Sequence, residues 1–327
     1  MRREKLNFDK LHRLDLFKLV TVNILLTVCL TAGSMARQLG QKGFPSPEDA
    51  SNALLLAAQS NDEEALLKIL GPEGKQIISS GDEIEDAQDR ANFISKYREM
   101  HRLVKEPDGT TTLYIGAENW PSPVPLVNRR GSWYFDAATG KKEILYRRIG
   151  LNEISTIRVC QELVAAEKEY YSTQQHEYAR YIFSIGERHN GLYWKAADGE
   201  PESPIGPLVA SAVAEGYATG RDSAPTPYRG YYYHILTGQT KNAPGGATSY
   251  ILNGKMTKGF AFVAFPAEYR SSGVMTFIVG VDGVVYQKDL GKKTAVLAKA
   301  MKEFNPDSHW QKAEEQQEQS SEKQEAK

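Results

Sequence analysis

The stretch GVMTFIVGVDGVVY at residues 273–286 decides one half of the fold. Two runs rich in β-branched and aromatic residues flank the pair Asp282-Gly283, and Asp-Gly favours a two-residue turn between antiparallel strands. The sequence therefore predicts a β-hairpin over this stretch. Because side chains alternate between the two faces of a strand, Phe277 and Val279 should share the face that a helix covers.

That helix is expected upstream of the strands. We expect Gly150 to mark a domain boundary and Asn152 to cap a long helix, whose apolar stripe includes Cys160. Two more strand-like runs lie at residues 231–236 and 260–265. A long helix packed on an antiparallel sheet predicts a pilin-like α+β domain over residues 150–310.

Residues 44–149 are predicted to form a separate α+β domain in which helices precede strands. Ser46 is placed to cap a first helix, and Asn61 with Glu64 forms a capping box for a second one. Alternating apolar runs broken by Gly and Pro then predict an antiparallel meander over residues 103–135. This order is similar to the cystatin-like or NTF2-like fold, in which helices pack on the concave face of a curved antiparallel sheet.

The N-terminal segment has the pattern of a secretory signal peptide. A basic region that begins at Arg2 precedes an uncharged run over residues 19–36, in which Ser34 and Ala36 provide small residues for cleavage. Residues 1–36 are therefore predicted to be removed, with the mature chain periplasmic or secreted. The alternative is an inner-membrane anchor formed by residues 19–36, a run just long enough to cross a bilayer.

The composition argues against some classes of partner. Lys and Arg number 40 against 41 Asp and Glu, so the formal net charge of -1 offers nucleic acid no overall attraction. No nucleic acid is expected as a partner, and a membrane only through an uncleaved leader. Residues 311–327 are nearly all polar and are predicted to be a disordered tail.

No catalytic motif is found in the chain. It has no Gly-x-Ser-x-Gly elbow, no Walker loop and no paired-His metalloprotease helix, and its His residues are too dispersed to predict a zinc site. We therefore expect no cofactor and no metal, and an enzyme is the less favoured interpretation.

A candidate ligand or partner surface is predicted on the Gly- and Pro-rich segment around residue 200. Three acidic residues follow two aromatic ones there, and clustered carboxylates suit a calcium loop or a carbohydrate-facing surface. The alternative is a solvated turn. The curved sheet and helices of the first domain would form a cone. An aromatic-proline stretch in this domain can close the open end of that cone over a ligand, or it can form a rigid sheet edge. The candidate residues are Trp120, Tyr193, Trp194, Asp198, Glu200 and Glu202.

Four motifs carry a family resemblance. They are Ile-Ser-Ser-Gly-Asp at 78–82, Gly-Leu-Tyr-Trp at 191–194, Gly-Glu-Pro-Glu-Ser-Pro at 199–204 and Gly-Val-Met-Thr-Phe-Ile-Val at 273–279. Together they resemble a bacterial exported family, domain of unknown function 2950, over residues 44–310. The resemblance implies export but no activity. The second domain is also similar to the soluble half of type II secretion pseudopilins, although here another domain precedes its helix.

Two classes of function follow from these patterns. The first is a non-catalytic binding or assembly protein of the cell envelope, whose partners are envelope proteins or cell-wall components. The second is a small-ligand binder or an enzyme that uses the cone of the N-terminal domain. Convergent Asp, His or Tyr groups inside that cone would favour the second class, and an aliphatic interior would favour the first.

Overall fold

The computed structural model describes residues 40–79, 83–173, 176–184, 190–194, 203–205 and 227–313. The chain divides into two compact units, Met1–Glu143 and Ile144–Lys327. The predicted signal peptide, with its candidate anchor at residues 19–36, lies outside the described residues. Among the helices that the structure does describe, none combines the length and apolar character needed to cross a membrane.

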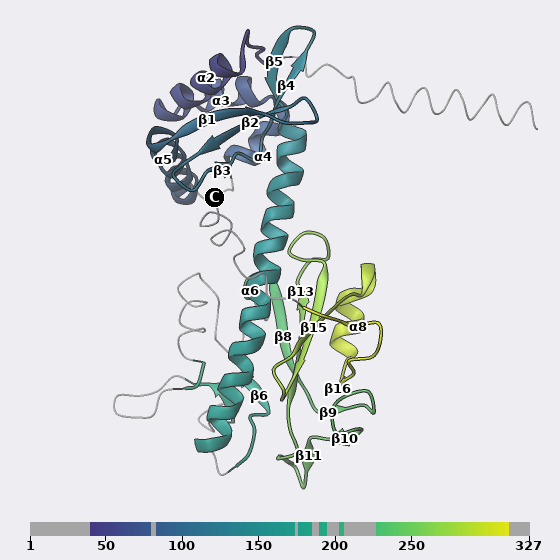
Figure 1. The fold of residues 1–327 in the computed structure, drawn as a ribbon. Coiled ribbons are helices and arrows are strands. Elements are labelled where there is room, and N and C mark those ends of the chain that lie inside the picture. Colours follow the sequence, from purple (N-terminus) through teal and green to yellow (C-terminus); the bar gives the residue numbers. More distant parts are fainter. Residues whose placement is uncertain are drawn as a thin grey trace, which may run out of the picture. The chain divides into compact units, whose positions relative to one another are not determined.

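The first unit opens with helices (Figure 1): α2 (Pro47–Gln59), α3 (Glu63–Leu70), the 3-10 turn η3 (Pro72–Gly74), α4 (Lys75–Ile78) and α5 (Glu83–Glu99). Ser46 caps α2 as predicted, because its Oγ accepts the Asp49 N–H at 3.0 Å. The cap of α3 is Asp62, which accepts the Ala65 N–H at 2.9 Å. The prediction of Asn61 as this cap is wrong by one residue, because Asn61 adopts a positive φ of 50° in the preceding turn.

An antiparallel sheet completes the first unit. Its strands are β1 (His101–Lys105), β2 (Thr111–Ile115), β3 (Trp120–Pro121), β4 (Leu126–Arg129) and β5 (Ser132–Phe135). They are ordered β1-β2-β4-β5, with β3 paired to β2. Residues of β2 alternate between buried and half-buried positions, which is the pattern of a strand with one face on a core. The predicted order of helices and then an antiparallel meander is confirmed.

Helix α6 (Ala137–Thr173) is one continuous helix of 37 residues. The predicted helix start at Asn152 is wrong, since that position lies inside the helix. The Asn152 amide instead donates from Nδ2 to the Ser272 carbonyl oxygen at 2.8 Å. Gly150 is also helical, and the two compact units divide between Glu143 and Ile144. That residues 44–149 and 150–310 fold separately stays a prediction.

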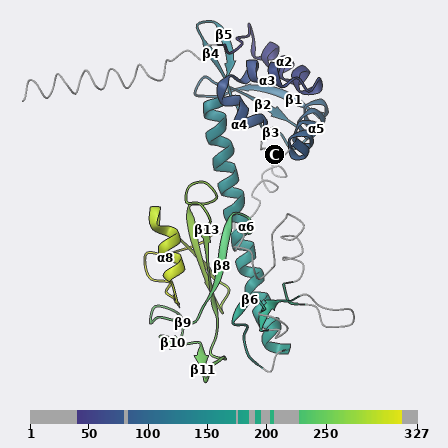
Figure 2. The ribbon, with the colours of Figure 1, turned by 180° about the vertical axis from the view of Figure 1, so that it is seen from behind.

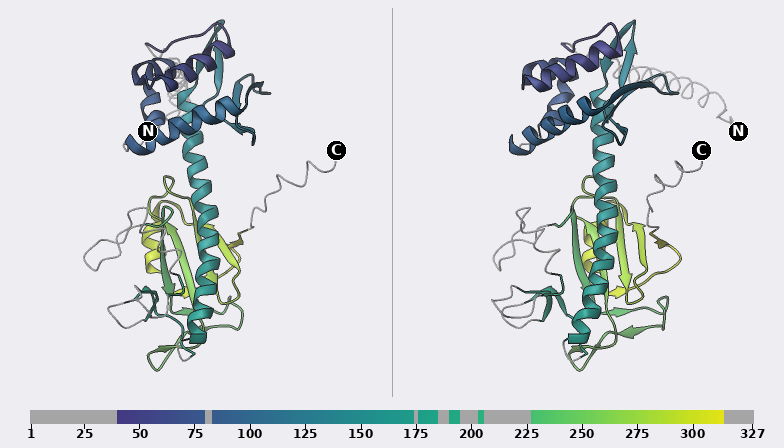
Figure 3. Two further views of the ribbon diagram at one scale, coloured as in Figure 1. Left: turned by 90° about the vertical axis from the view of Figure 1, so that its left-hand side faces the viewer. Right: turned by 60° about the vertical axis from the view of Figure 1, so that its left-hand side comes forward.

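The second unit is built on an antiparallel sheet ordered β17-β15-β14-β13-β8. The strands are β8 (Tyr231–Leu236), β13 (Ala261–Pro266), β14 (Met275–Gly280), β15 (Val285–Asp289) and β17 (Gln311–Lys312). Helix α6 lies along one face, and α8 (Thr294–Ala300) follows the turn η4 (Gly291–Lys293) and covers the other face (Figures 1 and 2). Figure 3 shows α6 crossing in front of these strands. The predicted α+β class is thereby confirmed, with a long helix on an antiparallel sheet.

Short strands extend the second unit. They are β6 (Tyr181–Phe183) parallel to β7 (Gly191–Tyr193), β11 (Ile251–Leu252) with β12 (Lys255–Met256), and β9 (Gly238–Gln239) between β10 (Thr248–Ser249) and β16 (Glu303–Phe304). Strand β17 contradicts the start of the predicted disordered tail, because Gln311 pairs with Gln287 and Ala313 N–H donates to the Val285 oxygen at 2.9 Å. Backbone pairing of this kind needs no apolar side chains.

The hairpin predicted from Asp282-Gly283 is present, with a longer loop than two residues. Strand β14 pairs with β15 from Met275–Asp289 to Val279–Val285. The Gly283 N–H donates to the Gly280 oxygen at 3.0 Å, Gly283 has φ 77°, and Asp282 Oδ1 accepts the Val284 N–H. This is a type I turn followed by a left-handed residue, which an Asp-Gly pair also suits.

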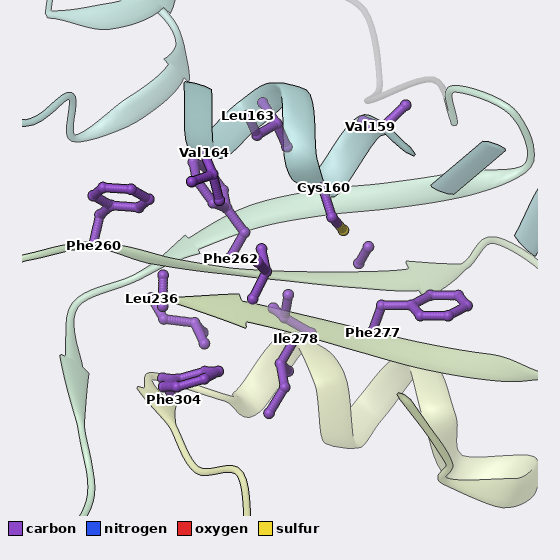
Figure 4. Packing of buried hydrophobic residues seen from close by; sticks show 14 of the residues in the cluster. Val159, Cys160, Leu163, Val164, Leu236, Phe260, Phe262, Phe277, Ile278 and Phe304 are labelled. Atoms are coloured by element: carbon purple, nitrogen blue, oxygen red, sulfur yellow. The ribbon is translucent and has the colours of Figure 1, made fainter. Parts of the chain in front are cut away.

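The core of the second unit lies on both faces of the sheet (Figure 4). Val159, Cys160, Leu163 and Val164 of α6 lie above one face, and Ile278 points to the opposite face, toward Phe304. Phe277 and Val279 are fully buried, and the Phe277 ring contacts the ring of Tyr231 at 5.8 Å. Tyr231 is itself beside α6, since its hydroxyl donates to the Met275 oxygen at 3.0 Å and the Met275 N–H donates to Glu153 Oε1 of α6 at 3.0 Å. Phe277 therefore faces α6 as predicted.

Candidate functional site

The interior of the first unit is the feature on which the two predicted classes of function differ. Its buried cluster consists of hydrocarbon side chains: Phe44, Ala50, Ala57, Ala58, Leu66, Ile69, Leu70, Val124, Leu126, Phe135 and Ala137. A second cluster adds Tyr97, Leu113 and Ile115. Within the described part of this unit, no convergent set of carboxylates and imidazoles points into the core. The interior is that of a packed core and is mainly aliphatic.

One buried polar pair interrupts this interior. The Ser51 and Tyr97 hydroxyls lie 2.8 Å apart and share a hydrogen bond, and Tyr97 OH also reaches Asn52 Oδ1 at 3.4 Å. The His101 ring stacks on Tyr97 with centroids 4.0 Å apart, but its Nδ1 lies 3.0 Å from the Tyr97 carbonyl oxygen. The imidazole is thus engaged with backbone, and neither ring nitrogen is placed to activate Ser51. This pair satisfies its own hydrogen bonds as a structural group does.

The structure places the sequence-predicted surface residues in different surroundings. Trp120, on β3 opposite Ile115, is 47% exposed and belongs to the first unit. Tyr193 is half-buried, and Trp194 is only 8% exposed within the core of the second unit. Trp120 therefore belongs to one unit, and Tyr193 and Trp194 belong to the other. The predicted acidic residues Asp198, Glu200 and Glu202 lie outside the described residues.

The Gly-Leu-Tyr-Trp motif is anchored by backbone hydrogen bonds and by packing. The Ser184 N–H donates to the Tyr193 oxygen at 2.8 Å, and the Gly191 N–H donates to Ser184 Oγ at 3.0 Å. Leu192 is fully buried, and its carbonyl accepts the Ile205 N–H at 3.4 Å. The motif therefore contributes alternate side chains to the core, which is what a partly buried strand requires.

The second unit, to which this motif belongs, also contains a buried carboxyl group. The sequence patterns had not singled it out. Glu167 on α6 is completely buried, and its Oε2 accepts the Ala179 N–H at 2.8 Å. Its Oε1 has no hydrogen-bond partner within the described part of the chain. Burial raises the pKa of Glu167 to about 8, against the lowering effect of the Ala179 bond. At neutral pH this group is therefore mostly a neutral acid.

Aromatic rings surround the segment that Glu167 holds. Tyr178 stacks on Tyr171 with centroids 4.4 Å apart and packs on Phe260 at 5.0 Å. The Tyr178 N–H donates to the Met256 oxygen at 2.7 Å. Burial, followed by the charges of Tyr171 and Glu167, raises the pKa of Tyr178. Glu167 thus fixes the chain after α6 in an apolar, aromatic environment, and no partner acid or base accompanies it there among the described residues.

A periodicity in the sequence could have identified this residue. Cys160, Leu163 and Val164 recur at the spacing of one helix face, and Glu167 continues the same face one turn later. An acidic residue at a position where the apolar stripe requires an apolar one is the sequence signal that could have identified Glu167. Cys160 itself is a buried hydrophobe as predicted, because burial raises the pKa of its thiol to about 12 and keeps it protonated.

Metal binding has no support in the described residues. They contain no cluster of three or more His, Cys, Asp or Glu side chains placed to hold an ion. His234, which is half-buried with its Nε2 3.4 Å from the Met301 oxygen, has its pKa lowered by burial. It is a neutral core-edge imidazole with a backbone partner.

These features define the class of protein: two α+β units whose buried clusters consist mainly of apolar side chains. Comparison with known families then identifies the family. The model for "Protein of unknown function (DUF2950)" matches residues 41–313, so the chain belongs to that family. The resemblance carried by the four sequence motifs is confirmed. No curated protein and no solved structure matched the chain, and the pilin-like, pseudopilin and cystatin-like or NTF2-like resemblances stay predictions.

Proposed function

We propose that this protein is exported to the cell envelope and acts there as a non-catalytic binding or assembly protein. Its partners would be other envelope proteins or cell-wall components. The observation that carries the proposal is the interior of the first unit, whose main buried cluster consists of hydrocarbon side chains rather than of convergent polar groups. The buried hydroxyls of Ser51 and Tyr97 there are hydrogen-bonded to each other.

The export part rests on the basic and then apolar N-terminal sequence that ends at Ala36. Intact mass of the chain recovered from its native envelope tests this part. We expect a species that begins at Arg37. A chain that begins at Met1 in the membrane fraction would favour the anchor, and a full-length chain in the cytoplasm would refute export.

The binding part is tested by crosslinking from the surface of the folded chain in living cells. A photoreactive amino acid at Trp120, which is 47% exposed, should give discrete crosslinked adducts. The matched control is the same amino acid at Leu56, a 63% exposed position of the same unit. Adducts that are equal at both positions would mean that Trp120 marks no binding surface.

The ligand-binding alternative has its own test. If the first unit held a small molecule, Tyr97→Phe would remove a hydroxyl from the interior and change the binding of that molecule. We expect Tyr97→Phe to lower stability by about 1 kcal/mol, through loss of the bond to Ser51, and to leave the crosslinking pattern unchanged. A small molecule that copurifies with the wild-type chain and is lost from Tyr97→Phe would overturn the non-catalytic proposal.

A further inference from the structure

Helix α8 exposes an apolar tip on the second unit. Its inner side is buried at Thr294 and Ala298, which are 1% and 0% exposed. On the other side Val296 is 70% exposed and Leu297 is 46% exposed. Exposed apolar side chains are common on protein surfaces, so what singles out this pair is the charge that surrounds it.

Lysines surround this tip. At 100° per residue, the centre of the face opposite Thr294 and Ala298 falls at Val296. Position 299 flanks Val296 on this face, and positions 292 and 293 lie in the 3-10 turn that leads directly into the helix. The lysines of the turn, the helix and the segment after it are Lys292, Lys293, Lys299 and Lys302, and all are exposed.

These charges are not neutralised by neighbouring acids. Within the part of the chain that the structure describes, none of the four forms an ion pair. Lys299 lies 6.0 Å from the centre of the Tyr232 ring. Of the nearest acids in sequence, Glu303 is exposed at the far end, and Asp289 accepts the Tyr269 hydroxyl and the Gly291 N–H. The chain's near-zero net charge therefore conceals a local basic surface.

The geometry points to an anionic lipid bilayer as the occupant of this surface, which we call the α8 face and define as residues 292–302. An apolar side chain at the centre enters the boundary between headgroups and acyl chains, while surrounding lysines reach the phosphates with their long stems. Each Lys that lies at an anionic membrane surface strengthens binding to that surface by about fivefold. A soluble polyanion would pair with the lysines and gain nothing from Val296.

This inference uses the proposed export only for its setting, because an envelope protein faces membranes. It does not need the binding partners or the leader. Its failure would leave export, as measured by intact mass, untouched.

The test is binding of the full chain to vesicles that contain about one third anionic phosphatidylglycerol, measured by co-sedimentation. One variant replaces Lys292, Lys293, Lys299 and Lys302 with Gln. A matched control replaces four exposed lysines elsewhere in the chain with Gln: Lys105, Lys142, Lys241 and Lys258. The two variants then have the same net charge and the same N-terminal sequence. A third variant, Val296→Asn, removes the more exposed of the two apolar side chains and leaves every charge in place.

We expect the α8-face variant to bind more than a hundredfold more weakly than the control variant, and Val296→Asn to bind roughly tenfold more weakly than wild type. Zwitterionic vesicles should bind all chains equally. Equal loss in the two lysine variants would mean that net charge alone acts, and no loss in either would mean that another segment binds. Binding that long-chain polyphosphate displaces and that Val296→Asn leaves unchanged would identify a polyanion site. Each of these results would overturn the inference.

Discussion

Replacing the buried Glu167 with Gln should change how stability depends on pH. In the folded chain burial raises the Glu167 pKa to about 8, whereas the ordinary value is 4.5. Between these values the folded state keeps a proton that the unfolded state releases. Stability is therefore fully present below pH 4.5, falls as the pH rises, and stops changing above about pH 8. Each pKa unit corresponds to about 1.4 kcal/mol, so the whole window is worth up to about 5 kcal/mol.

Gln retains the geometry of the site without the titration. Its side-chain oxygen can still accept the Ala179 N–H, which Glu167 Oε2 accepts at 2.8 Å. We therefore expect Glu167→Gln to resemble wild type at pH 5 and to be more stable by about 3 kcal/mol or more at pH 8. The pH-dependent slope that is specific to Glu167 should disappear.

Urea unfolding at pH 5, 6, 7 and 8, followed by tryptophan fluorescence, measures this difference, because Trp194 is buried in the same core. The control is Glu162→Gln, an exposed position of the same helix, which should shift stability equally at every pH. If the difference between Glu167→Gln and wild type is constant across the range, the buried carboxyl is ionised in the folded state and the reasoning fails.

Two further pairs of substitutions test the packing. Gly150→Ala should stabilise the chain by about 1 kcal/mol, because it lies within α6 and an added Cβ meets no atom within 4 Å. Gly140→Ala, on the same helix, should destabilise the chain by about 1–3 kcal/mol, since its Cβ would lie 2.6 Å from Val124 Cγ2. Thermal melts in which Gly140→Ala has the higher melting temperature of the two variants would contradict the continuous helix. Phe277→Ala should lower the free energy of unfolding by about 3–5 kcal/mol, because Phe277 is fully buried. Val281 is 39% exposed, so Val281→Ala should lower it by less than about 0.5 kcal/mol. Equal losses of stability in urea unfolding would show that Phe277 is not a core residue.

Local rules predicted those elements whose residues act alone. Ser46 caps its helix through its own hydroxyl, and Asp282 with Gly283 turns the chain through their own conformational preferences. The α+β class followed because strand and helix periodicities were both clear. In each case the interaction spans only a few residues, so the sequence contains all of it.

The misplaced features depend on partners that are distant in the chain. Gly150 was interpreted as a break, yet a helical glycine costs only about 1 kcal/mol, which tertiary packing outweighs. Strand β17 was missed because Gln311 takes its place by backbone pairing with Gln287. Trp194 was assigned to a surface from the polar residues that follow it, whereas it is buried within a cluster whose other members are distant in the chain.

The candidate site was predicted only in part for the same reason. Glu167 appeared in the sequence as one acid among many, and its perturbed pKa arises from the core that folds over it. The α8 face was hidden by a net charge that averages the whole chain. A charge count within a window of about ten residues would have found it.

Strand β13 has a consequence for the chain before it folds. All six of its residues are buried, and the segment from Gly259 to Ala267 carries no charge between Lys258 and Glu268. Within it the uncharged, β-prone run 260–265, which contains no Pro or Gly, readily pairs with copies of itself while it is exposed. Variants that slow the docking of α6 or α8 on this strand should therefore be lost to aggregation at high concentration before any change in equilibrium stability becomes measurable.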